Sequence, residues 1–164
     1  TSNAKADQYM SLLIRPVVRT DLTALKSVLG TIELFPPDLL DEMIANYLDQ
    51  PESADIWLAA TENDKVLALA YCAPEQLTEG TFNLYAIGVM KTAQGRGIGR
   101  QMMAYLEAHL QELGHRILIV ETSGADDFQR TRQFYKHLAY HHEATIRDFW
   151  QAGEDKVIFW KRLN

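Results

Sequence analysis

The first 55 residues combine one short apolar run with two stretches of helical spacing. Residues 12–18 are typical of a strand, and residues 22–29 repeat apolar side chains every three or four positions after Asp21, a residue that favours a helix start. After the two prolines at positions 36 and 37, a second helical pattern begins and should end before Pro51. The pattern therefore predicts one strand followed by two helices.

Three strand-like runs follow from residue 56. Residues 56–61 and 66–73 are separated by polar residues that include Asn63 and Asp64, an arrangement typical of a hairpin turn. Residues 81–90 form the third run after turn-forming residues near Gly80. These runs predict a three-strand meander.

Helical and strand patterns alternate through the rest of the chain. The pattern predicts, in order, a helix at residues 98–113, a strand at 116–120, a helix at 128–138, and two antiparallel strands at 141–150 and 156–163. The fold class is therefore α/β of the α+β type, with a mixed, mostly antiparallel sheet of about seven strands and about four helices. We expect residues 9–164 to form one domain and residues 1–8 to be a tag remnant or a flexible N-terminus.

Composition narrows the functional class only by exclusion. The 164 residues are 47% hydrophobic, and the single cysteine excludes a disulfide scaffold. No apolar run approaches the roughly 20 residues that span a bilayer, so we expect no membrane partner and a cytoplasmic location. The net charge is −6 and no segment concentrates Lys or Arg, which disfavours nucleic-acid binding.

The segment QGRGIG at residues 94–99 carries the strongest chemical signal. Its glycines do not have the spacing of the dinucleotide fingerprint, and no Gly-Lys-Ser/Thr of a phosphate-binding P-loop follows. A glycine-rich turn that leads into a helix still directs unpaired N–H groups at one point, where Arg96 and Arg100 add positive charge. The segment therefore predicts a phosphate or pyrophosphate site, although a plain strand-to-helix turn would use the same glycines.

The same segment resembles the signature of the GCN5-related N-acetyltransferase (GNAT) superfamily, with Gln94, Gly97 and Gly99 at its fixed positions. TRQFYKHLAY, residues 131–140, looks like the family's later helix, although Ala139 and Tyr140 replace a glycine and a phenylalanine. VETSG and the C-terminal IRDFWQAGEDKVIFWKRL are similar to bacterial members of unassigned substrate. The order of predicted elements also matches the family.

The resemblance implies an acetyl-coenzyme A (acetyl-CoA) site. Backbone N–H groups of residues 94–100 would bind the pyrophosphate, and the pantetheine arm would pair with the strand at residues 87–89. Gly88 fits this role, because a glycine within a strand often marks a close backbone approach. The implied cofactor-binding residues are Ile87, Gly88, Val89, Gln94, Gly95, Arg96, Gly97, Ile98, Gly99 and Arg100.

The resemblance also implies acetyl transfer to a primary amine of a small molecule or peptide, by direct transfer in a ternary complex. Tyr135 matches the family's tyrosine acid, which protonates the leaving thiolate. Several family members carry a glutamate on the central strand, but Asn83 stands there and cannot usefully accept a proton. Glu33 and Glu121 are the candidate bases, and a water chain is the alternative.

The acceptor is expected to contact the first two helices and the last hairpin. Candidate substrate residues are Glu33, Phe35, Tyr85, Asp148, Phe149 and Trp150. His137, His141 and His142 lack the spacing of a zinc motif, so no metal is predicted. The family suggests a homodimer. Two other functions stay open at this point: a non-catalytic acyl-CoA-binding sensor that needs no Tyr135, and an unrelated phosphate-binding regulator.

Overall fold

A computed structural model describes residues 12–164 of the chain, and the expectation for residues 1–8 lies outside this range. The described residues form seven strands and four α-helices, which confirms the predicted fold class. The sheet has the strand order β1-β2-β3-β4-β5-β7-β6. The described residues divide into two compact units, one of residues 12–72 and 86–105 and one of residues 73–85 and 106–164.

The first unit follows the predicted element order closely. It contains β1 (Leu12–Pro16), α2 (Leu22–Leu29), α3 (Leu40–Asp49), β2 (Ile56–Glu62), most of β3 (Lys65–Pro74), the end of β4 (Thr81–Val89) and the start of α4 (Ile98–Glu112). Asn63 and Asp64 both have positive φ, 50° and 63°, as a two-residue hairpin turn of the primed type requires. The predicted β2–β3 hairpin is therefore confirmed.

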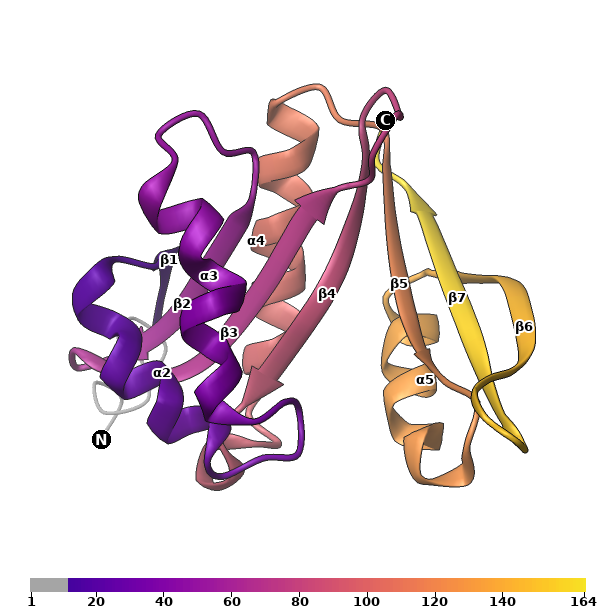
Figure 1. Cartoon of the computed structure of the whole chain (residues 1–164), viewed down its shortest axis with the longest axis horizontal. Helices are drawn as coiled ribbons and strands as arrows, with labels where there is room; N and C mark the ends of the chain where they lie inside the picture. The colour runs from indigo at the N-terminus through magenta and orange to yellow at the C-terminus, as the bar shows by residue number, and fades with distance from the viewer. Residues whose placement is uncertain (1–11) are drawn as a thin grey trace, which may run out of the picture. The chain divides into compact units, whose positions relative to one another are not determined.

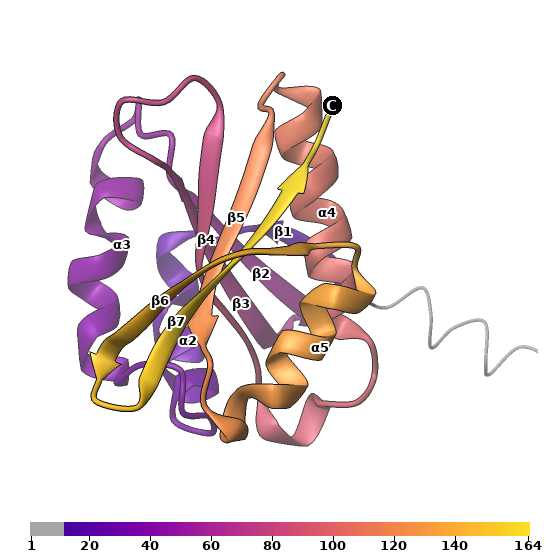
Figure 2. The ribbon, with the colours of Figure 1, turned by 90° about the vertical axis from the view of Figure 1, so that its right-hand side faces the viewer.

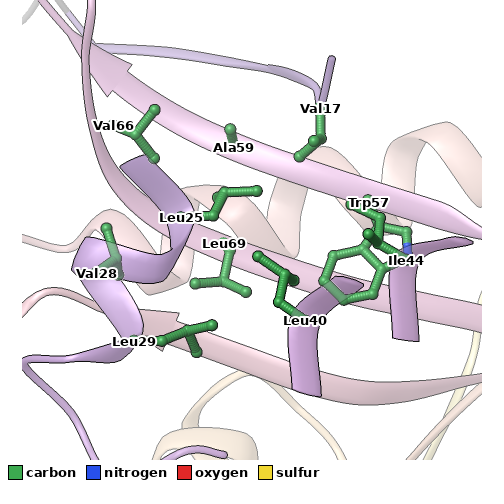
Figure 3. Close-up of a cluster of buried hydrophobic side chains, with 10 residues drawn as sticks. All are labelled: Val17, Leu25, Val28, Leu29, Leu40, Ile44, Trp57, Ala59, Val66 and Leu69. Atoms are coloured by element: carbon green, nitrogen blue, oxygen red, sulfur yellow. The ribbon is translucent and has the colours of Figure 1, made fainter. Parts of the chain in front are cut away.

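Helices α2 and α3 lie over strands β1 to β3 (Figure 1). Their apolar stripes point at the strands and form a buried cluster with them (Figure 3). The cluster consists of Val17, Leu25, Val28, Leu29, Leu40, Ile44, Trp57, Ala59, Val66 and Leu69. Burial of each large aliphatic side chain stabilises the fold by roughly 1.5–3 kcal/mol, so this cluster fixes where α2 ends and where the loop of residues 30–37 begins.

An ion pair joins the start of α2 to β1. Both guanidinium nitrogens of Arg15 donate to the carboxylate of Asp21, at 2.7 and 2.9 Å, and the Val18 N–H donates to the same carboxylate at 2.8 Å. Asp21 is 7% exposed. The sequence predicted that Asp21 favours the helix start, and it does precede α2, but its side chain forms no cap hydrogen bond to that helix and binds Arg15 and the Val18 N–H instead.

The second unit contains the rest of α4 and β4, with β5 (Ile117–Ser123), α5 (Gln129–His137), β6 (His141–Gln151) and β7 (Glu154–Arg162). The parallel ladder between β4 and β5 spans Thr81–Leu84 and Ile117–Val120, and β5, β7 and β6 pair antiparallel. Figure 2 shows α5 beside β5 and β7. The last two strands of the unit therefore form a hairpin, and its outer strand, β6, is exposed along its length.

Candidate active site

The glycine-rich turn lies between a short 3-10 helix (Lys91–Ala93) and α4. Gly95 and Gly97 have φ of 80° and 78°, and a Cβ at either position would meet no atom within 4 Å. The Gln101 N–H donates to the Gly97 carbonyl as the helix begins, so the amides of residues 98–100 precede that bond. The turn is thus open and presents helix N-terminal N–H groups, as the sequence predicted for an anion site.

Side chains around the turn fix its position and determine how much positive charge lies beside it. The Gln94 amide donates to the Val89 carbonyl at 3.0 Å, which holds the turn against the end of β4. Arg96 forms an ion pair with Glu62 of β2, so its charge is already partly neutralised. Arg100 is exposed in the first turn of α4, where no acidic residue lies.

Gly88 lies under the loop of residues 30–37. A Cβ at Gly88 would lie 2.5 Å from Cδ1 of Ile32 and 3.0 Å from Cδ2 of Leu34. The groups that lie close to this glycine are therefore the side chains of this loop, and the expected approach of the pantetheine arm stays a prediction. Its two neighbours in the predicted cofactor set, Ile87 and Val89, are partly buried.

The loop of residues 30–37 contains two of the predicted acceptor residues. It lines a hollow of about 460 Å³ together with Leu29. Glu33 is exposed and Phe35 is partly buried, and both line this hollow. The Lys91 N–H donates to the Thr31 hydroxyl at 3.1 Å, which ties the loop to the segment before the glycine turn.

In the second unit, Tyr135 on α5 is 4% exposed. Its ring packs near the rings of Phe134, Tyr140 and Phe159, with centroid distances of 5.2–5.8 Å. Burial raises the pKa of the Tyr135 hydroxyl above its ordinary value. The phenol therefore stays protonated at neutral pH and can donate a hydrogen bond.

Glu121 lies on β5 and is ion-paired with Lys156 of β7 at 2.8 Å. The Lys156 ammonium also lies 4.1 Å from the centroid of the Phe149 ring and 5.9 Å from that of Trp150. The structure thus brings three predicted residues, Glu121, Phe149 and Trp150, around one lysine that the sequence did not single out. Both aromatic side chains are about half exposed.

An interruption of the β6–β7 ladder positions this aromatic pair. The pairing passes from Ile146 with Lys156 to Gln151 with Glu154, which leaves residues 147–150 outside the ladder. Asp148 has φ of 53°; its N–H donates to Asp155, and its carboxylate accepts the Gly153 N–H at 2.9 Å. Asp148 therefore has a structural task that its prediction as a substrate residue did not anticipate.

Glu75 is a carboxylate that the sequence analysis missed. It follows β3 directly, and its Oε1 accepts hydrogen bonds from the Asn83 amide at 2.7 Å and from the Tyr85 hydroxyl at 3.3 Å. Asn83 is 1% exposed, and its Oδ1 has no hydrogen-bond partner within the described part of the chain. The available signal was the position of Glu75 in the loop that leads into β4.

Comparison of the sequence with models of protein families shows the family of this chain. The model of the acetyltransferase (GNAT) family matches residues 22–140. The chain belongs to the GNAT family. GNAT enzymes transfer an acetyl group from acetyl-CoA to amines of small molecules or peptides, so this chain is an N-acetyltransferase.

Solved structures of GNAT proteins have the same fold. A GNAT-family protein from Desulfovibrio desulfuricans has 28% identity and a TM-score of 0.88, over 94% of this chain and 100% of its own. The ribosomal-protein-S18-alanine N-acetyltransferase of Escherichia coli has 20% identity and a TM-score of 0.77, over 93% and 94%. The aminoglycoside 6'-N-acetyltransferase of Enterococcus faecium has 15% identity and a TM-score of 0.76, over 93% and 97%. No curated protein matches the chain.

Three further observations concern a solved neighbour, the helices of this chain and its metal-ligating residue types. A solved aminoglycoside 6'-N-acetyltransferase with a TM-score of 0.68 contains coenzyme A, at 16% identity and over 93% of this chain and 97% of its own. No helix among residues 12–164 is long and apolar enough to cross a membrane. In the same residues, no three His, Cys, Asp or Glu side chains gather as metal ligands, and His142 instead shares a hydrogen bond with Thr145.

Proposed function

We propose that this enzyme acetylates a primary amine of a small molecule or peptide by direct transfer in a ternary complex. The open glycine turn at the start of α4 is the observation that carries the proposal, because it offers N–H groups and unfilled space for a pyrophosphate. Acetyl-CoA, when bound, supplies the activated thioester. The residues proposed to hold it are those at 87–89 and 94–100.

Direct transfer is favoured by the state of the single cysteine. Cys72 is 1% exposed, and burial raises the pKa of its thiol. A protonated, buried thiol is a poor nucleophile. We therefore propose that the acceptor amine attacks the acetyl group itself, with a backbone N–H near Ile87 as the donor to the oxyanion.

Three residues are proposed to move or hold protons. Tyr135 donates to the leaving sulfur, and its raised pKa favours hydrogen-bond donation over full proton transfer. Glu33 and Glu121 stay the candidate bases beside a water chain. Glu33 is exposed, whereas Glu121 would have to accept a proton within its ion pair with Lys156.

In the first unit, Glu33 and Phe35 stay the proposed acceptor residues, because both line the hollow of the loop of residues 30–37. In the second unit, Tyr85, Phe149 and Trp150 stay the proposed acceptor residues, because each is about half exposed. Asp148 stays a proposed substrate residue, although its N–H and its carboxylate both form hydrogen bonds within the hairpin. A cytoplasmic location and a homodimer stay predictions from the sequence.

A thiol-release assay over a panel of amines tests this function. Alkylamines, polyamines, amino acids, aminoglycosides and peptides are each incubated with acetyl-CoA, and free coenzyme A is measured over the background hydrolysis. We expect at least one class to release thiol in a 1:1 ratio with acetylated amine. Tight acetyl-CoA binding in calorimetry with no acetylated product from any amine would contradict the proposal and favour a sensor.

A further inference from the structure

Three polar side chains converge at the start of β4 and form what we call the Glu75 cluster: Glu75, Asn83 and Tyr85. Glu75 is partly buried, Asn83 is fully buried, and Tyr85 is 49% exposed. Asn83 and Tyr85 are two positions apart on β4, so their side chains point to the same face of the sheet. The cluster therefore extends from the interior to the surface along one face of the strand.

Within residues 12–164, the carboxylate of the Glu75 cluster forms no ion pair. Its Oε1 accepts two hydrogen bonds, whereas its Oε2 accepts none from the described residues. The other partly buried glutamates of this unit differ, because both oxygens of Glu154 accept hydrogen bonds, from Ser123 and Gln151, while Glu107 pairs with Lys161 and Glu121 with Lys156. The Oε2 of Glu75 is not among the buried atoms that lack a partner, so this oxygen is open to a cation from solution.

Asn83 adds a second unsatisfied acceptor. Its Nδ2 must face Glu75, because the reversed amide would place a carbonyl oxygen against a carboxylate. That orientation leaves the buried Oδ1 without a donor. An orphaned buried acceptor costs about 1–3 kcal/mol, which is tolerated in a native structure mainly where a site requires it.

What the Glu75 cluster lacks is therefore a positively charged group with several N–H donors. An ammonium has one positive charge and three donors, and an alkyl chain attached to it would pass the exposed ring of Tyr85. A neutral hydroxyl would leave the carboxylate charge uncompensated. A carboxylate or phosphate ligand would be repelled.

We propose that the Glu75 cluster binds an ammonium group of the acceptor, so that the acceptor is an alkylamine that is cationic at neutral pH. The inference rests on the proposed function only in taking the bound ammonium to belong to the acceptor. Glu75 forms the ion pair, Asn83 orients its carboxylate, and Tyr85 contacts the alkyl chain. The site selects cationic amines over neutral and anionic compounds.

Glu75→Gln tests the role of the charge in turnover. The variant keeps the shape and an acceptor for Asn83, so the fold should be retained. We expect KM for a cationic amine to rise about 10- to 100-fold, while the affinity for acetyl-CoA stays unchanged. Glu79→Gln is the matched control, because Glu79 is an exposed glutamate of the same loop, and its KM should equal that of the wild type. Equal KM values for all three proteins would overturn the inference.

A binding experiment separates this inference from the proposed function. The probe is 1,4-diaminobutane, with its neutral N,N′-diacetyl derivative as the control ligand, and the readout is the NMR signal of the Asn83 side-chain NH₂ group. We expect the diamine to shift this signal in wild type and not in Glu75→Gln, and the diacetyl derivative to shift neither. No shift with the diamine overturns the site, whatever the turnover. A shift without acetylation of any amine supports the ammonium site and overturns the proposed function.

Discussion

The Tyr135 side chain combines ring packing in the core with a hydroxyl that is proposed to donate a proton or hydrogen bond. The ring fills space between α5 and β7 near Phe159, and the hydroxyl is held neutral by a raised pKa. A phenol with a pKa above its ordinary value of about 10 stays a donor through the physiological range. A buried core position and a role as the family's acid are therefore compatible at Tyr135.

Tyr135→Phe should separate the two tasks. The phenylalanine keeps the ring contacts, so the melting temperature should change little, whereas kcat should fall about 10²- to 10⁴-fold. The affinity for acetyl-CoA, measured by calorimetry, should stay within a factor of two to three. A variant with wild-type kcat would exclude the hydroxyl from catalysis. Tyr135→Ala is the contrasting change and should cost roughly 3–5 kcal/mol of stability.

Single residues also show where sequence reasoning reached its limit. The need for space at Gly88 was predictable, because a strand glycine indicates close approach, but the identity of Ile32 and Leu34 as its neighbours was not. Glu75 was missed because its partner Asn83 is separated from it by a loop whose course no pattern specifies. Local residue types predict that a contact is needed at a position, and tertiary structure decides which group makes that contact.

At the scale of elements, the glycine turn and the start of α4 form the proposed pyrophosphate site. The glycine-rich turn and the helix start at residue 98 were predictable from the local sequence, whereas the ion pair of Arg96 with Glu62 was not. The strands β6 and β7 were predictable as a pair, but the excursion of residues 147–150 was not. That excursion depends on the hydrogen bond from the Asp148 N–H to the Asp155 carboxylate and on the one from the Gly153 N–H to the Asp148 carboxylate, which can be assigned only when the hairpin register is known.

Gly97→Ala and Gly114→Ala form a matched pair that tests the turn. The two glycines have φ of 78° and 82°, and a Cβ at either position would meet nothing within 4 Å. Both variants should lose about 1 kcal/mol of stability from the left-handed backbone. Only Gly97→Ala should weaken acetyl-CoA binding in calorimetry, by tenfold or more, because its methyl group enters the proposed pyrophosphate space. Equal affinities in the two variants would argue against the site.

At the scale of the whole molecule, the ion pair of Arg15 and Asp21 should make stability depend on pH. The hydrogen bonds from Arg15 hold the pKa of Asp21 below its ordinary value of about 3.9. A lowered folded pKa means that the contribution is complete above about pH 4 and is lost as the pH falls through the folded value. Above about pH 4 the ion pair therefore makes its full contribution to the stability of the folded protein.

Asp21→Asn tests this dependence. The variant should be less stable than the wild type by about 2 kcal/mol at pH 7, and the difference should shrink steadily below about pH 4. Urea unfolding at pH 7, 4 and 2.5 measures the free energies. Asp49→Asn is a suitable control, because Asp49 pairs with Arg19 on the surface, where both side chains are more than half exposed. A difference between wild type and Asp21→Asn that is constant with pH would contradict the assignment.

Ligand binding should also be measurable as a property of the whole fold. Acetyl-CoA at a hundred times its Kd should stabilise the protein by about 2.7 kcal/mol, which corresponds to a rise in Tm of about 5–10 °C for a chain of this size. ATP at the same concentration serves as the control and should give a much smaller rise. Equal rises would indicate a general phosphate site and not a site for coenzyme A.

The hydroxyl of Thr31 connects two segments with different tasks. It accepts the Lys91 N–H and donates to the Val28 carbonyl at 2.8 Å, so the loop with Glu33 and Phe35 is fastened to the segment that enters the glycine turn. Occupancy of the turn should therefore favour one arrangement of the acceptor loop, and we expect the cofactor to bind first in an obligatory order. In Thr31→Val, product-inhibition kinetics should change from an ordered to a random pattern while kcat at saturation is retained. One threonine hydroxyl would then set the sequence in which two substrates enter.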